Sequence, residues 1–242
     1  MTGSASGQGP PDRPPERWVY ESIAGSIPGV ELTRTVALLV QLLVFEAGVL
    51  VLAIGYSRWD GLLAGTTAVV IAAAGSVFLL TIGRRIRRLD VPKRYTQVLF
   101  GSGIEIVLGL GSFIALLTYL FVIDPRSGGT TLLADLLGDP LPAPAVFFTL
   151  LVLWDVCYRI GTGWWASLVG LWRSVALGDT VDSATAEELV RIDAITIAFA
   201  WTQLALVPFV TDHIFLAAAL VGHVVAVTLV SGVSILVIRN TD

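Results

Sequence analysis

Six long apolar runs constrain the fold more than any other feature of this sequence. Each is 17 to 28 residues long, and together they cover residues 35–56, 61–83, 96–123, 145–172, 194–210 and 214–238. A helix of about 20 apolar residues is enough to cross the hydrocarbon core of a bilayer. Backbone polar groups in lipid must be hydrogen-bonded within the protein, and the runs lack the alternation of barrel strands. The sequence therefore predicts an all-α integral membrane protein, a bundle of six transmembrane helices.

The composition agrees with a membrane location. Charged residues make up 14 % of the chain and hydrophobic residues 55 %, with a mean hydropathy of +0.81, whereas a soluble domain carries about a quarter charged residues. The formal net charge of −4 is too small to indicate a nucleic-acid partner. Cys157 is the only cysteine, so no intramolecular disulfide can form.

The N-terminal region, residues 1–34, is predicted to be a disordered tail with a short interfacial segment. Residues 1–16 are rich in Gly, Pro and Ser, a composition typical of disorder. Trp18 and Tyr20 follow, and such aromatics favour the membrane interface. Residues 35–242 then form the transmembrane domain. Before the fifth run, Thr185 and Glu188 have the spacing of a capping box, which predicts that its helix starts outside the apolar stretch.

Basic residues predict the orientation in the membrane. The loop between the second and third runs holds six positive charges, at Arg84, Arg85, Arg87, Arg88, Lys93 and Arg94. By the positive-inside rule this loop is cytoplasmic. Alternation then leaves Arg58 and Arg126 alone in two outer loops. We therefore expect a cell-membrane protein with both termini in the cytoplasm.

The same basic loop has a second interpretation, as a binding site for anionic lipid head groups. The positive-inside rule alone explains its composition, so the role in topology is the simpler reading. The lipid bilayer is the one partner that the sequence identifies, and it leaves any protein partner unknown.

Several polar residues lie deep within the apolar runs. An ionisable side chain at the bilayer centre costs about 2.5–3.5 kcal/mol even on the most lenient scale, so each should face protein or water. Five helices carry such groups at similar depth, and these could converge into one intramembrane polar cluster. The candidate residues for an ion or proton site are Glu46, Glu105, Asp155, Arg159, Gln203 and His223.

Spacing supports part of this cluster. Asp155 and Arg159 are four residues apart, an acid before a base on one helical face. Glu105 lies four residues from both Gly101 and Gly109, in a stripe where another helix or a cavity can approach. Three buried carboxylates and one buried arginine leave a net charge of −2, which favours protonation of a carboxylate or binding of a cation.

Two functions remain open at this point. In the first, the protein is a small proton- or cation-linked transporter or channel-like protein: Glu46 and Glu105 carry the proton or ligate the cation, and Asp155 orients Arg159. In the second, it is a non-catalytic scaffold or assembly subunit whose buried charges fix helix register. Metal-binding HExxH or Cys/His patterns, the GxSxG elbow and phosphate-binding glycine loops are absent from the sequence. The sequence thus predicts neither enzyme activity nor a cofactor or metal.

Overall fold

A computed structural model describes Trp18 and residues 34–240. In this part of the chain 86 % of residues are helical and none is in a strand, and six helices are long and apolar enough to cross a membrane. The predicted all-α class is confirmed, and so are six helices with the length and apolar composition of membrane spans. Apart from Trp18 and Arg34, the predicted N-terminal tail lies outside the described residues.

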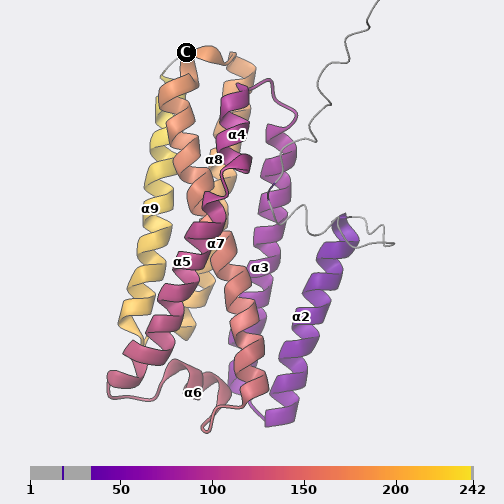
Figure 1. The fold of residues 1–242 in the computed structure, drawn as a ribbon, viewed down its shortest axis with the longest axis vertical. Helices are drawn as coiled ribbons and strands as arrows, with labels where there is room; N and C mark the ends of the chain where they lie inside the picture. Colours follow the sequence, from indigo (N-terminus) through magenta and orange to yellow (C-terminus); the bar gives the residue numbers. More distant parts are fainter. Residues whose placement is uncertain (1–17, 19–33, 241–242) are drawn as a thin grey trace, which may run out of the picture.

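The helices form an elongated bundle (Figure 1). The bounds of its helices are α2 Arg34–Tyr56, α3 Trp59–Ile86, α4 Lys93–Gly101, α5 Ile104–Thr118, α6 Leu132–Leu137, α7 Ala143–Leu177, α8 Ser183–Thr202 and α9 Ile214–Arg239. A π-helical turn, Tyr119–Ile123, extends α5, and the 3-10 segment η4, Gln203–Phe209, extends α8.

The third span is broken, where the sequence predicted one continuous helix. Gly103 separates α4 from α5 and has a φ of +67°, in the left-handed region that glycine adopts without steric cost. The loop after α5 contains α6, which no apolar run predicted because it has only six residues. Thr131 caps α6 by accepting a hydrogen bond from the Ala134 amide at 3.2 Å.

Helix α8 starts at Ser183, and the predicted capping box at Thr185 and Glu188 is wrong. The cap is Asp182, whose carboxylate accepts a hydrogen bond from the Thr185 amide at 3.0 Å. Hydrogen bonds from Thr185 hold the pKa of Asp182 below its ordinary value. Glu188 instead pairs with Arg85 of α3 and Arg191 of its own helix.

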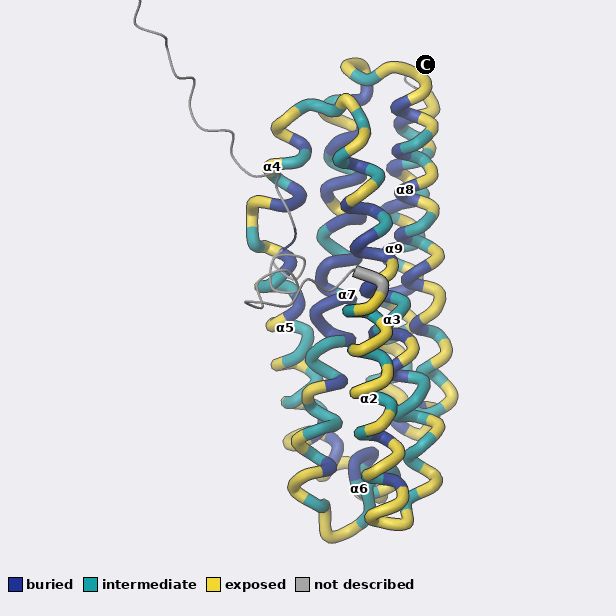
Figure 2. The backbone as a smooth tube through the Cα atoms, turned by 90° about the vertical axis from the view of Figure 1, so that its right-hand side faces the viewer, coloured by how far each residue is buried: buried dark blue, intermediate teal, exposed yellow. Residues whose placement is uncertain are grey.

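Helix α7 is the centre of the bundle. It packs against α3, α5, α8 and α9, whereas α2 packs mainly on α3. In Figure 2 the buried stretch of α7 is dark blue. Glycines allow the closest approach: a Cβ built on Gly161 of α7 would lie 2.4 Å from the Gly109 nitrogen of α5. Close backbone contact of this kind is how membrane helices gain packing energy.

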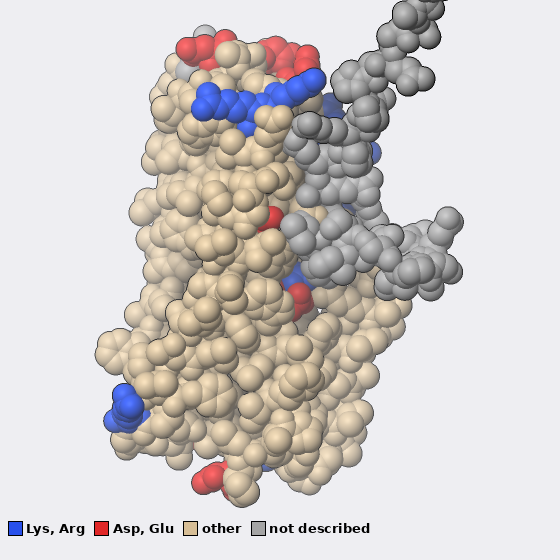
Figure 3. Space-filling view, viewed as in Figure 1, with Lys and Arg blue, Asp and Glu red and all other residues tan. Residues whose placement is uncertain are grey.

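Charge is concentrated at the ends of the bundle. The basic loop between α3 and α4 lies at the same end as Arg239 of α9. Blue and red atoms gather near that end in Figure 3, and the middle of the visible face is almost wholly uncharged. This distribution fits a bundle surrounded by lipid, whose apolar outer surface needs no other cover.

Candidate functional site

The candidate site is built around Arg159 on α7. Its guanidinium forms an ion pair with Asp155, one turn earlier on the same helix. Nη1 also donates to the Asp155 backbone carbonyl at 2.9 Å, and Nη2 donates to the Ser76 hydroxyl of α3 at 2.6 Å. The Arg159 side chain is 1 % exposed, against 14 % for Asp155. The predicted i,i+4 pair therefore exists and reaches across to a second helix.

Helix α2 completes this network through Gln41. The Gln41 amide donates to an Asp155 carboxylate oxygen at 2.9 Å, and the Ser76 hydroxyl lies 3.4 Å from the Gln41 carbonyl oxygen. We call Gln41, Ser76, Asp155 and Arg159 the Arg159 network. It joins α2, α3 and α7 through uncharged and charged hydrogen bonds, and a buried polar network of this kind favours one helix register.

Packing around the Arg159 network is tight. A Cβ built on Gly75 would lie 2.1 Å from Cδ of Arg159, so glycine makes room for the arginine stem. The pocket that Gln41 and Asp155 line has a volume of about 10 Å³. A single water needs about 10–15 Å³, so this pocket holds one water at most.

Glu46 lies outside the Arg159 network. Its carboxylate accepts a hydrogen bond from the Thr66 hydroxyl of α3 at 2.8 Å. Its other oxygen is buried and has no hydrogen-bond partner. Among the described residues, no hydrogen bond or ion pair connects Glu46 with Arg159.

Glu105 is isolated as well. It lies in the first turn of α5, is fully buried, and neither carboxylate oxygen has a hydrogen-bond partner in the described part of the chain. An ionised carboxylate without a partner is costly in a low-dielectric interior. The site therefore accommodates the neutral carboxylic acid better than the anion.

The two remaining candidates lie on other elements. Gln203 begins η4, is 1 % exposed, and its carbonyl oxygen lacks a partner. His223 of α9 packs beside the Trp164 ring at 5.7 Å, and both of its ring nitrogens are buried without a hydrogen bond. Of the six candidate residues, the structure joins only Asp155 and Arg159 directly.

The structure contains a second buried ion pair, which the sequence patterns do not predict. Arg173 of α7 donates to the Asp193 carboxylate of α8 at 2.8 Å, and the two side chains are 2 % and 3 % exposed. Ser234 of α9 donates to the same Asp193 oxygen at 2.7 Å, and Ser174 lies 2.9 Å from Ser234. We call these four residues the Arg173 network.

One signal in the sequence could have revealed the Arg173 network. Arg173 follows Arg159 by fourteen residues, close to four helical turns, so both arginines lie on one face about 21 Å apart along α7. The whole face between them is buried, with small residues such as Gly163, Ala166 and Gly170.

A third buried pair, Asp124 and His213, lies in the loop region around α6. His213, which precedes α9, lies with Nδ1 2.9 Å from an Asp124 carboxylate oxygen. The other Asp124 oxygen accepts a hydrogen bond from the Leu132 amide of α6 at 2.8 Å. This arrangement ties the start of α6 to the start of α9.

The described residues contain no group of three or more His, Cys, Asp or Glu that could hold a metal ion. The buried polar groups thus form several small networks and a few isolated residues instead of one centre. Their shared chemistry is hydrogen bonding between helices.

Comparison with known proteins adds one finding. No curated protein and no solved structure matches the chain. One family profile matches residues 14–234, which is most of the chain. The protein belongs to this group, described as a family of unknown function (DUF7530).

Proposed function

We propose that this protein is a non-catalytic membrane scaffold or assembly subunit, with buried charges that hold its helices in register. The observation that carries the proposal is the Arg159 network, in which an ion pair and hydrogen bonds between side chains join α2, α3 and α7. Pairs that are already matched have no need of a transported ion for neutrality.

The surroundings of the network support the same proposal. An ion-transport site needs a water-filled or ion-sized space beside its carboxylates, and the pocket at Asp155 has about 10 Å³. The Arg173 network repeats the pattern with a buried arginine, one aspartate and two serines. Each network links three helices, as a structural role requires.

A proton- or cation-linked transporter is the second candidate, and Glu105 is the observation that favours it. A fully buried carboxyl without a hydrogen-bond partner can change its protonation when water or a cation reaches it. Glu46 also keeps one unpaired oxygen. In this alternative the two glutamates carry the exchangeable proton, and Arg159 tunes them.

The orientation belongs to the same proposal. With the basic loop on the cytoplasmic side of the cell membrane, both termini are cytoplasmic and the α6 end faces outward. Anionic lipid head groups are the partners that the basic loop would attract.

Flux through liposomes containing the purified protein separates the two candidates. A scaffold gives proton and cation flux equal to that of protein-free liposomes under every imposed gradient. A transporter gives a flux that Glu105→Gln abolishes, whereas Glu187→Gln, which alters an exposed acid on α8, leaves it unchanged. Flux with that sensitivity would overturn the scaffold proposal.

A further inference from the structure

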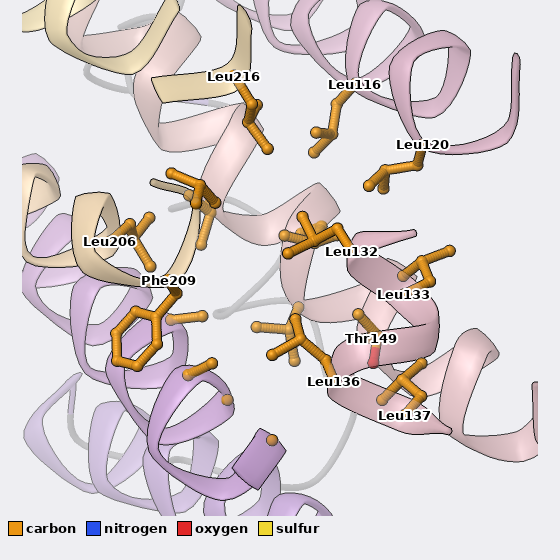
Figure 4. Close-up of a pocket in the computed structure, with 18 of the residues that line it drawn as sticks. Leu116, Leu120, Leu132, Leu133, Leu136, Leu137, Thr149, Leu206, Phe209 and Leu216 are labelled. Atoms are coloured by element: carbon orange, nitrogen blue, oxygen red, sulfur yellow. The ribbon is translucent and has the colours of Figure 1, made fainter. Parts of the chain in front are cut away.

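An apolar cavity of about 200 Å³ lies inside the bundle next to α6. Leucines converge on it from α5, α6, η4 and α9, as Figure 4 shows for Leu116, Leu132, Leu206 and Leu216. Thr149 and Cys157 supply the only oxygen and sulfur side-chain atoms among the residues that line it. Cavities with such walls stay dry and bind apolar molecules.

A second cavity, of about 330 Å³, adjoins the first between α5, α7 and α9. The two cavities share the side chains of Leu116, Cys157, Ile160, Leu216 and Leu220. The second reaches the outer surface of the bundle, because its lining includes the exposed residues Ala115, Ala219 and Phe215, the last 71 % exposed. In a membrane this opening faces lipid. A molecule dissolved in the bilayer can therefore enter the bundle from the side.

His223 lines this second cavity together with three other side chains that carry polar atoms, Ser112, Tyr119 and Trp164. It lines the space one turn after Ala219, and neither ring nitrogen has a hydrogen-bond partner. It is nine residues into α9, about 14 Å from the start of the helix and near the middle of the bilayer. A neutral imidazole has one donor and one acceptor, and leaving both unpaired in an apolar site costs free energy.

We propose that the two cavities bind a single-chain amphiphile from the membrane, with a hydrocarbon chain that ends in a hydroxyl or carboxylic acid group. The chain occupies the leucine-lined cavity beside α6, and its polar end binds His223. The two ring nitrogens point away from each other, so a hydroxyl or a protonated carboxyl pairs with one of them, donating to the bare nitrogen or accepting from the N–H. Trp164 packs beside the imidazole and covers this end of the site.

Photolabelling of the full-length protein in lipid nanodiscs tests the site. The probe is hexadecanol with a mid-chain diazirine, and mass spectrometry of peptides locates the adducts. Adducts on Ile160, Leu216 and Leu220 should fall about tenfold with excess unlabelled hexadecanol, because the unlabelled alcohol competes with the probe for one saturable apolar pocket. Adducts on lipid-facing Leu43 and Leu229, 65 % and 63 % exposed, should not fall, because contact with bulk lipid does not saturate. Cavity adducts that do not saturate in the unchanged protein would overturn the proposal.

Two variants one residue apart sharpen the test. Ala219→Phe places a ring at the opening and should lower the cavity adducts about tenfold. Ala218→Phe adds the same ring on the exposed surface next to it and should leave them unchanged. Equal labelling of the two variants would contradict entry between α5 and α9.

Competition identifies the polar end. Hexadecanol or palmitic acid should compete with the probe better than hexadecane, and whichever of the two competes best identifies the terminal group. His223→Phe should remove the advantage over hexadecane while leaving chain binding in place. Equal competition by hexadecane in the unchanged protein would show that His223 does not bind the polar end.

Discussion

Arg159 on α7 lies directly against Gly75 on α3, where a Cβ would come within 2.1 Å of Cδ and 2.9 Å of Cγ. Glycine at position 75 thus allows the arginine to reach Ser76, the next residue on the same helix. This contact connects a packing requirement of α3 with the charge on α7.

The substitution Gly75→Ala should therefore destabilise the protein by about 1–3 kcal/mol. The aliphatic part of the Arg159 side chain would have to move, and this would distort the hydrogen bond from Arg159 to the Ser76 hydroxyl. Thermal unfolding in detergent measures the loss. Gly111→Ala is the matched control, because nothing lies within 4 Å of a Cβ at that position of α5. Equal stability of the two variants would show that the Arg159 side chain can move away from a Cβ at position 75 without cost.

A glycine-to-alanine substitution should destabilise the protein more where α5 crosses α7 than at Gly75. In Gly161→Ala the new Cβ meets backbone atoms of Gly109 at 2.4 and 2.8 Å, and backbone cannot rotate away as a side chain can. We expect Gly161→Ala to lower the free energy of unfolding by an amount at the upper end of the range of about 1–3 kcal/mol. Gly163→Ala, two residues along α7, meets only ordinary contacts with Phe199 at 3.7 Å and beyond, so its unfolding midpoint should stay close to that of the unchanged protein.

The Arg173 network should behave as a matched buried pair. Arg173→Ala leaves the Asp193 carboxylate uncompensated and should cost about 3–5 kcal/mol. Combining Arg173→Met with Asp193→Leu removes both charges and should restore most of the stability, as measured by thermal unfolding. A double variant no better than Arg173→Ala would mean that the serines, and not the ion pair, determine the stability of this region.

The orientation predicts accessibility of engineered thiols. Because Cys157 is the only cysteine, the Cys157→Ala protein provides a thiol-free background. Single cysteines then replace Arg88, Arg126 and Asn240. An impermeant thiol reagent added outside intact cells should label only position 126, since the positive-inside rule keeps the other two in the cytoplasm. Labelling at position 88 would reverse the orientation.

The spans could be predicted because each depends on a local property, a run of apolar residues long enough to cross lipid. The break at Gly103 and the short helix α6 could not, because neither changes the hydropathy of the chain over a helix length. Likewise the cap at Asp182 lay one turn before the residues that resembled a capping box.

The Asp155–Arg159 pair could also be predicted, since four-residue spacing places both groups on one helical face. Its partners Gln41 and Ser76 could not, because contacts between helices depend on how each helix is rotated about its axis. The same rotation keeps Glu46 and Glu105 apart from the pair, although their depths in the membrane are similar. Arg173 was missed because a basic residue at the end of an apolar run resembles an interfacial one.

The central claim is that the Asp155 and Arg159 charges act as a matched pair that holds α2, α3 and α7 together, and thermal unfolding of charge-neutral variants tests it most directly. Arg159→Ala alone leaves Asp155 unpaired and should cost about 3–5 kcal/mol. Asp155→Asn combined with Arg159→Gln removes both charges and keeps groups that can hydrogen-bond to Gln41 and Ser76. This double variant should unfold within a few degrees of the unchanged protein, whereas a midpoint as low as that of Arg159→Ala would contradict the role of the two charges as a matched pair.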